Sequence, residues 1–277
     1  VPIHGRSGGG VTCILISAVK SVRHLQHGIR DAAFEIGYEG SSVIEWTGES
    51  VRQRTLMLAL ESTHARDRAI SNIHLLAAPR KLITFQRVEL ENAVNSWRAG
   101  DTSNFDYLMY LNFAAGRSFN DLSQYPVLPW IISDYFSEKL DLGDPESFRD
   151  LSLPIGALNQ SRLEILKHRF HEMPSPRFFY GTHYSTPAYI INYLVRTAPA
   201  AMLRLQSGNF DAPDRIVSSI PETWRGVNSN TTDVKELIPE FFAISANETP
   251  SGLVPSGATA GEFLDNVLGL NLGTRQD

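Results

Sequence analysis

The stretch Ala115-Gly-Arg-Ser-Phe-Asn-Asp-Leu-Ser-Gln-Tyr-Pro-Val-Leu-Pro-Trp130 decides how the rest of the chain is interpreted. Its last part, Tyr125 to Trp130, cannot lie inside a helix, because two prolines remove backbone donors and restrict the residues before them. The segment must therefore be extended, and its side chains are apolar enough to be buried. A buried segment outside regular structure leaves backbone groups that need hydrogen-bond partners.

Two clusters in the sequence mix charged residues with apolar bulk: Arg117-Ser-Phe-Asn-Asp121 and Asp233-Val-Lys-Glu-Leu-Ile-Pro-Glu-Phe-Phe242. Buried charges are costly unless they are paired and hydrogen-bonded. Such clusters therefore mark either an active site or an extended backbone held by side chains, and the proline-rich segment favours the second. We predict that six residues are structural and hold this segment through buried hydrogen bonds: Arg117, Asn120, Asp121, Asp233, Lys235 and Glu236.

Helical patterns dominate the chain on both sides of this segment from Ile83 onward. Ser103 or Asn104 is a plausible N-cap for the second predicted helix. The stretch 234–242 is short and apolar, and the stretch 246–260 is rich in Ser, Thr, Gly and Pro, which is typical of a flexible loop. The predicted helices are Val88–Trp97, Asn104–Asn112, Arg162–Phe170, Thr186–Arg196 and Ile216–Trp224.

The first 60 residues read as a small sheet closed by one helix. Short apolar runs at 11–16, 32–36 and 42–46 predict three strands, with Gly37 and Gly40 turning the chain between the last two. The stretch Val51 to Leu60 spaces apolar residues among arginines and predicts a helix. Between Ser62 and Lys81 the sequence is polar and mixed, so we place a domain boundary there.

Composition excludes several classes of function. The chain has 277 residues, 42% of them apolar, and a net charge of -5, so it lacks the basic stripe that nucleic-acid binding requires. Cys13 is the single cysteine, which excludes an intramolecular disulfide and a thiolate metal site and suits a reducing compartment. We therefore treat the Asn-x-Ser/Thr triplets at Asn159, Asn230 and Asn247 as chance. No apolar run approaches the roughly 20 residues of a membrane-spanning helix. The start at Val1 and the polar end suggest a piece of a longer chain.

Motifs for catalysis or cofactor binding are absent. Neither nucleotide-binding glycine loop occurs, and Gly8 to Gly10 is better read as a flexible leader. His168 and His171 share a helix face, but no carboxylate or third histidine has a suitable offset for a metal site. His183 could join Ser185 and either Asp233 or Glu236 in a triad, yet the G-x-S-x-G elbow is missing. We predict no catalytic residue, no cofactor and no metal.

Six blocks, in the same order as in the family, resemble the BEACH domain family over roughly Leu82 to Gly273. The resemblance adds Trp130, Arg149, Asp150 and His183 to the predicted structural signature. The blocks begin at Ser103 and end at Phe242: Ser103–Asn112, Ala115–Trp130, Phe148–Gly156, Tyr180–Ser185, Phe210–Arg215 and Asp233–Phe242.

The family also implies a PH-like domain before the BEACH domain, and Ala18 to Leu60 resembles its later part. We therefore predict an α+β protein in which a partial PH-like sheet-plus-helix unit, residues 1–78, packs on a mostly helical BEACH domain with extended irregular core segments, residues 82–277. Two departures stand out. The stretch 246–260 looks like an insertion before Gly261-Glu-Phe-Leu-Asp265, and the chain stops before the family's final acidic, Pro-Pro-Trp-containing strip.

The resemblance implies a function as well. Family members are very large cytosolic or peripheral membrane proteins, usually with downstream WD40 repeats. They act as non-enzymatic scaffolds in vesicle traffic, lysosome-related organelles or autophagy. The expected partners are other proteins, with cytoplasmic localisation and possible peripheral attachment to endolysosomal or vesicle membranes. Two alternatives stay open: a phosphoinositide-binding recruitment module, which lacks a basic loop cluster in its sheet, and a hydrolase centred on His183.

Overall fold

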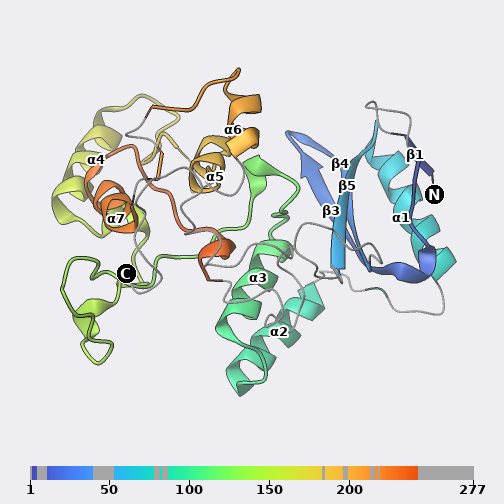
Figure 1. The fold of residues 1–277 in the computed structure, drawn as a ribbon, viewed down its shortest axis with the longest axis horizontal. Helices are drawn as coiled ribbons and strands as arrows, with labels where there is room; N and C mark the ends of the chain where they lie inside the picture. Colours follow the sequence, from blue (N-terminus) through green and yellow to red (C-terminus); the bar gives the residue numbers. More distant parts are fainter. Residues whose placement is uncertain are drawn as a thin grey trace. The chain divides into compact units, whose positions relative to one another are not determined.

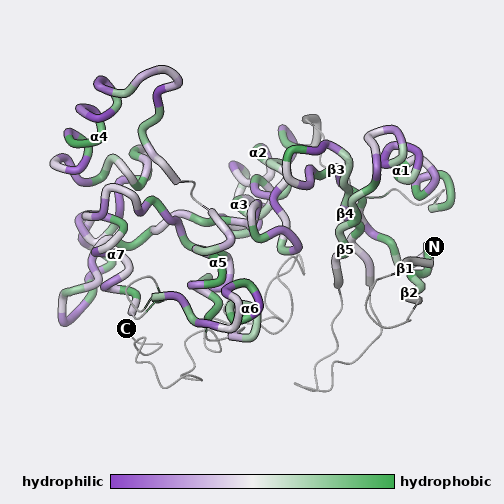
Figure 2. Tube along the Cα trace, turned by 90° about the horizontal axis from the view of Figure 1, so that it is seen from above, coloured by the Kyte–Doolittle hydropathy of each residue, from purple (hydrophilic) through white to green (hydrophobic). Residues whose placement is uncertain are grey.

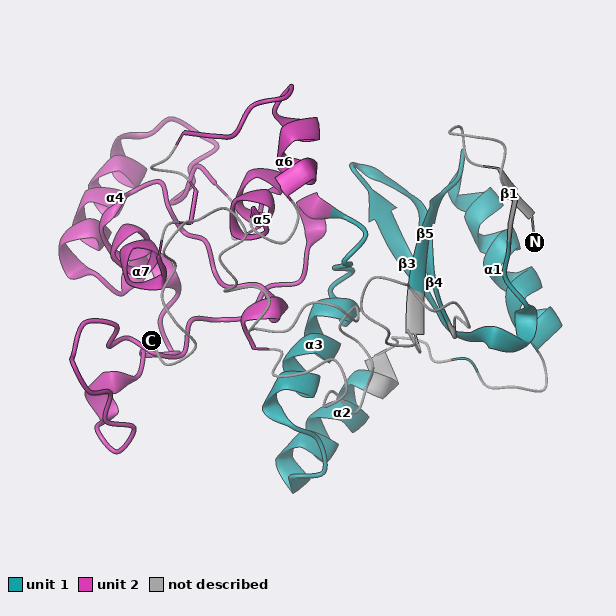
Figure 3. Ribbon diagram, viewed as in Figure 1, with its two compact units in different colours: residues 1–121, 246–257 teal, residues 122–245, 258–277 magenta. Residues whose placement is uncertain are grey.

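The computed structural model describes residues 2–4, 11–39, 53–77, 82, 87–182, 185–195, 199–212, 216–217 and 219–242 (Figure 1). The described part confirms the predicted α+β class, with seven α-helices and a three-stranded antiparallel sheet. The chain gathers into two compact units, divided between Asp121 and Leu122 (Figure 3). The boundary that the sequence places between residues 78 and 82 divides the PH-like part from the BEACH part. It is a different division and stays a prediction.

The first unit is built on a sheet of the order β3-β4-β5, with β3 Val19–His27, β4 Arg30–Glu39 and β5 Gln53–Ala59. Both strand pairs are antiparallel. The β3–β4 turn contains Gly28 at φ +60°, a left-handed conformation that glycine adopts without steric cost. Earlier in the chain, β1 Pro2–His4 pairs with β2 Val11–Cys13 in a separate ladder.

Helix α1, Thr63–Ala77, covers one face of this sheet. Its buried residues Arg66, Ile70, Ile73 and Ala77 recur every three or four positions, as one face of a helix requires. Ile70, Ile73 and Ala77 pack against alternate residues of the strands, among them Val22, Phe34 and Ile36. In Figure 2 the α1 trace carries both hydrophilic and hydrophobic stretches, in keeping with one buried and one exposed face.

Several predictions for this region were wrong. The stretch predicted as a helix from Val51 to Leu60 contains β5, because Leu56, Leu58 and Leu60 follow the period of two of a strand. The polar stretch from Ser62 to Lys81, for which no helix was predicted, contains α1, because the polar residues of its exposed face obscured the apolar ones. Strand β4 also runs through Gly37, where a turn was expected. The predicted strand at 42–46 lies outside the described residues.

The first unit also contains α2, Arg87–Ala99, and α3, Asn104–Ala114, both close to the predicted bounds. Ser103 is the N-cap of α3, because its hydroxyl oxygen accepts a hydrogen bond from the amide of Asp106. Trp97 of α2 stacks on Tyr107 of α3 with ring centroids 4.6 Å apart. The prediction of a capped helix here is confirmed.

Within its described residues, the second unit joins four α-helices by long stretches without regular structure. Helices α4 and α5 contain most of the predicted residues, whereas α6 was not predicted. Helix α7 begins four residues later than expected, because Ser219 caps it and Pro221 stands in its first turn. The helices are α4 Gln160–Glu172, α5 Pro187–Tyr193, α6 Pro199–Leu205 and α7 Ile220–Ser229, and the short 3-10 turns are Leu122–Gln124, Pro145–Ser147, Ile155–Ala157 and Pro239–Phe241. The first unit adds a further 3-10 turn at Ile16–Ala18.

The proline-rich segment is extended, as predicted, and it does find backbone partners. Leu128 exchanges two backbone hydrogen bonds with Leu237, of 2.8 and 2.9 Å. A few residues later, Ile132 and Phe148 form a second isolated bridge. We predicted that side chains would supply the hydrogen-bond partners of this segment, and the backbone of Leu237 supplies some of them as well. Across the described residues, none of the helices combines the length and hydrophobicity that crossing a membrane requires.

Candidate functional site

A buried charge cluster lies on the sheet face opposite α1. Arg23 of β3 and Glu35 of β4 are direct cross-strand neighbours and form an ion pair, with the Arg23 Nε donating to Glu35 Oε1 at 2.8 Å. Both residues are more than 90% buried. Burial lowers the pKa of the Arg23 guanidinium, and the Glu35 carboxylate acts in the opposite direction.

The segment after α3 completes this cluster. The Ser118 hydroxyl and the Asn120 side-chain amide both donate to the second oxygen of Glu35, the amide at 2.8 Å. Asn120 also donates to Thr55 of β5 at 2.9 Å. Arg23 in turn donates to the backbone carbonyl of Arg117 at 2.6 Å. The cluster thus ties the sheet to residues 117–120 and is saturated with internal partners.

A second cluster in the other unit surrounds Trp130. Its backbone amide donates to a carboxylate oxygen of Glu236, and its indole donates to the carbonyl of Lys235, both at 3.1 Å. Arg149 holds the same carboxylate through two bonds of 2.8 and 3.0 Å. Lys235 forms an ion pair with Asp233. These are the side-chain contacts that hold the extended segment beside residues 235–237.

Arg162 connects helix α4 to the surrounding turns through hydrogen bonds. Although more than 95% buried, it has no carboxylate partner among the described contacts and donates instead to backbone carbonyls of Ile155, Val227, Asn230 and Asp233. Burial lowers the pKa of this guanidinium. Because the carbonyl of Val227 lies in the last turn of α7, the positive charge also favours that end of the helix dipole.

A buried carboxyl group, that of Glu240, lies at the Tyr125 end of the extended segment. The hydroxyl of Tyr125 donates to Glu240, and both residues are at least 95% buried. Burial raises the pKa of Glu240, whereas the bond from Tyr125 lowers it. Burial and the nearby carboxyl likewise raise the pKa of Tyr125, so its hydroxyl stays protonated and can donate.

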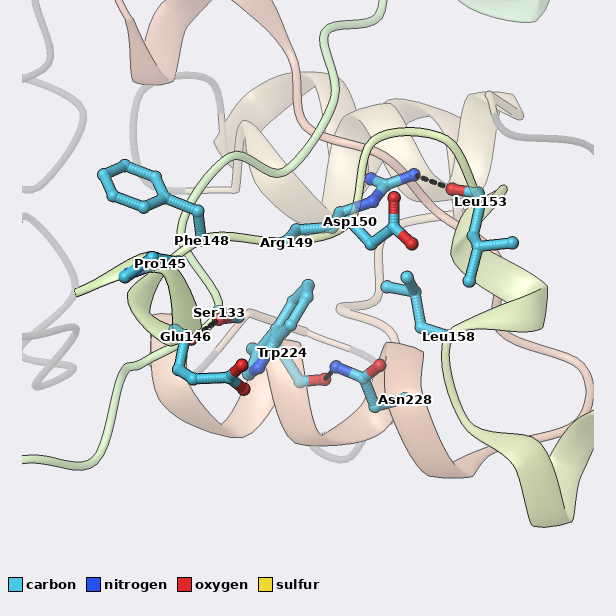
Figure 4. A pocket seen from close by; sticks show the side chains of 10 residues that line it. All are labelled: Ser133, Pro145, Glu146, Phe148, Arg149, Asp150, Leu153, Leu158, Trp224 and Asn228. Carbon is cyan, nitrogen blue, oxygen red and sulfur yellow. Dashed lines mark hydrogen bonds between the residues drawn. The ribbon is translucent and has the colours of Figure 1, made fainter.

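Beside Arg149 lies an open pocket of about 440 Å³. Figure 4 shows Trp224 of α7 in the middle of its lining residues, with Asp150 and Leu158 to one side and Glu146 to the other. Trp224 packs against Trp130 with ring centroids 5.3 Å apart, which anchors the pocket to the second cluster. The remaining lining residues are Ser133, Pro145, Phe148, Leu153 and Asn228.

The structure brings together half of the predicted signature. Trp130, Arg149, Asp233, Lys235 and Glu236 share the second cluster, and Asp150 lines the pocket next to it. Three others, Arg117, Asn120 and Asp121, belong to the first unit. His183 lies outside the described residues. Which of these residues matter for function stays a prediction.

The histidine pair and the cysteine are placed as follows. His168 is exposed and lies 3.2 Å from Glu172 one turn later, so a carboxylate does occur at a suitable offset, contrary to the sequence argument. Within the described part of the chain, no three His, Cys, Asp or Glu side chains gather as metal ligands. Cys13, the last residue of β2, is exposed.

Sequence reasoning missed the central roles of Glu35, Ser118 and Arg162. Glu35 had a signal: it is a lone charge in the apolar run Ala32-Ala-Phe-Glu-Ile36, and a charge inside a buried strand needs a partner. Ser118 and Arg162 had none, because their partners lie 83 and up to 71 residues away.

Comparison with known proteins settles the class. The Beige/BEACH domain family matches residues 95–277, about two thirds of the sequence, and the chain therefore belongs to the BEACH domain family. It is 36% identical over 272 residues to "BEACH domain-containing protein B" of Arabidopsis thaliana, a match that covers 95% of this chain and 10% of that protein. The "Putative neurobeachin homolog" proteins of Caenorhabditis elegans and Caenorhabditis briggsae are 52% and 48% identical, over 65% and 62% of this chain and 7% of each relative. The chain thus spans a tenth or less of the length of these curated relatives.

Proposed function

We propose that this chain is a non-enzymatic protein-interaction module of a large scaffold protein in membrane and vesicle traffic, including lysosome-related or autophagic membranes. Membership in the BEACH family supports the scaffold class. WD40 repeats elsewhere in the full protein and peripheral attachment to membranes belong to the same proposal. A contact between the PH-like sheet and the start of the BEACH part is included, supported by the hydrogen bonds that join Glu35 to Ser118 and Asn120.

One observation carries this proposal: the buried charged groups direct most of their hydrogen bonds to the chain's own backbone and to each other. Arg149 donates to Glu236, Glu236 also accepts from the extended segment at Trp130, and Arg162 donates to four backbone carbonyls. A catalytic group must instead keep free hydrogen-bonding capacity toward a substrate. The open pocket is lined by aromatic, aliphatic and acidic side chains, a surface suited to contact with another protein.

The hydrolase alternative receives no support from the two candidate acids. Asp233 is occupied by Lys235, and Glu236 by Arg149 and Trp130, so neither is free to orient an imidazole. Ser185 is buried. The structure does not describe His183 itself, and a direct test is therefore needed.

The deciding experiment is affinity isolation of the tagged 277-residue chain from cells, with each captured protein then purified and titrated against the chain. We expect at least one partner that binds saturably at a fixed stoichiometry. A screen of ester and peptide substrates with wild type and His183→Ala runs in parallel. The scaffold proposal is wrong if no partner binds saturably, and its non-enzymatic part is wrong if the wild type shows turnover that disappears in His183→Ala.

A further inference from the structure

The pocket beside Arg149 has a chemical character that points to one kind of ligand. This inference rests on the proposed function and names the chemistry of a partner. We propose that the pocket binds an arginine or lysine side chain presented by an extended segment of a partner protein.

Charge is the first argument. The Glu146 and Asp150 carboxylates line the pocket, and Arg149, the one cationic residue among the described lining residues, is already paired with Glu236. Three carboxylates against one guanidinium leave a local charge of -2. Hydrogen bonds from the hydroxyl and amide of Ser152 lower the pKa of Asp150, so this group stays ionised. A cationic ligand is attracted here, and an acidic or phosphorylated one is repelled.

The open hydrogen-bonding atoms give the second argument. In the described contacts the Glu146 carboxylate has no partner, and the Asn228 amide donates to the Trp224 carbonyl at 3.1 Å, which leaves its oxygen as an acceptor. The Ser133 hydroxyl is already used as a donor to the Glu146 carbonyl. The pocket therefore offers acceptors, and an ammonium or guanidinium group offers only donors.

The walls provide the third argument. Trp224 and Leu158 give the pocket an aromatic and aliphatic lining, which suits the methylene stem of a long basic side chain and a cation over an aromatic ring. At the rim, Phe148 and Leu153 are about 40% exposed. Apolar residues that flank the basic residue in the bound segment would contact them. A volume of about 440 Å³ is ample for one such side chain.

The test is an NMR titration of the ¹⁵N-labelled 277-residue chain with the acetylated tripeptide amide Leu-Arg-Leu, up to about 10 mM, a range that detects weak binding. We expect saturable shifts of the Trp224 indole and Asn228 side-chain amide signals. The same peptide with citrulline in place of arginine keeps the shape but loses the charge, and it should bind at least about tenfold more weakly. Glu146→Gln combined with Asp150→Asn should cause a similar loss. Glu146→Gln alone, at an exposed position, tests the charge without a risk to folding.

The matched control is Glu138→Gln, which removes an exposed carboxylate of the neighbouring loop outside the pocket and should leave the affinity unchanged. The proposal is overturned if the arginine peptide gives no saturable shift, if citrulline binds equally well, or if an acidic peptide binds better. Failure here leaves the scaffold proposal intact as long as affinity isolation yields a saturable partner. Absence of any such partner would contradict the scaffold proposal whatever the peptide does.

Discussion

At the scale of single residues, Glu35 is the position on which the first unit depends. Its carboxylate is shared by Arg23, Ser118 and Asn120, and removal of one member of a buried ion pair leaves the other charge without compensation. Such changes cost about 3 to 5 kcal/mol. We expect Glu35→Ala to lower the free energy of unfolding by that amount, measured by urea denaturation.

Two controls separate charge from packing at this site. Glu61→Ala removes an exposed carboxylate from the same unit and should change stability by less than about 0.5 kcal/mol. The double variant Arg23→Met with Glu35→Leu removes both charges and should recover part of the loss, because apolar replacements of a buried pair are often neutral. Equal stability of Glu35→Ala and wild type would refute the buried-pair argument.

Glu240 should make stability depend on pH. Because burial raises its folded pKa, the folded state holds a proton that the unfolded state releases, and stability falls as the pH rises from the unfolded carboxyl pKa through the folded one. Glu240→Gln keeps an acceptor for Tyr125 but has no charge. It should therefore raise the melting temperature at pH 8 by a few degrees and much less at pH 4, in differential scanning calorimetry. A gain independent of pH would exclude this cause.

At the scale of elements, Arg162 joins α4 to α7 and to the turn after it. Its bonds to Ile155, Asn230 and Asp233 measure 2.7, 2.9 and 3.1 Å, with a further bond to Val227. Lysine has three donors and no planar fork, so Arg162→Lys leaves buried carbonyls unsatisfied, at about 1 to 3 kcal/mol each. We expect a loss of more than about 2 kcal/mol in urea unfolding. Lys167→Arg, exposed on the same helix, is the matched control and should be neutral.

The elements that sequence reasoning predicted are those with local signals. The helix that begins after Ser103 has its capping residue next to it, and the segment that ends at Trp130 has its prolines. Strand β5 was misread because Leu56, Leu58 and Leu60 stand among arginines, which a helix tolerates equally well. Gly156 shows a steric requirement that depends on a distant residue. A Cβ at this position would lie 2.2 Å from the ring of Tyr180. Because Tyr180 is 24 residues away, no local pattern could indicate this contact.

The same distinction between local signals and long-range contacts applies to the candidate site. Lys235 and Glu236 were recognised because they are charged residues in an apolar run, and Arg149 and Asp150 came from the resemblance alone. Their convergence with Trp224 around one pocket depends on the fold of the whole second unit, since the lining residues span positions 133 to 228. The spacing of residues in a single sequence cannot predict that these side chains line the same pocket.

At the scale of the whole molecule, the first compact unit extends beyond the sequence boundary at residues 78 to 82. A fragment that ends at residue 81 keeps Arg23 and Glu35 but loses Ser118 and Asn120, whereas a fragment that ends at residue 121 keeps all four. We expect the longer fragment to show a cooperative thermal transition and the shorter one to aggregate or melt without one. Circular dichroism of both fragments checks this, and equal cooperativity would contradict it.

Binding to phosphoinositides can be tested on the same chain. Arg23 is paired with Glu35, and Arg66 is paired with Asp31 and Asp67. These two cations of the first unit are therefore unavailable to a phosphoinositide headgroup. We expect no more binding to phosphoinositide vesicles than to neutral ones, measured by co-sedimentation. Saturable binding that is lost in Arg30→Ala, an exposed position, would reverse this expectation. Arg23 is unsuitable for that test because its loss would destabilise the sheet.

The Glu35 cluster also has a consequence for biosynthesis. Glu35 and Asn120 are 85 residues apart in the chain. At about 5 to 20 residues per second, the ribosome needs roughly 4 to 17 s to add the residues between them. During that interval the nascent sheet can gain its α1 face while the other face still lacks Ser118 and Asn120. The growing polypeptide therefore passes through a half-covered stage, which is when chaperones would have most reason to engage it.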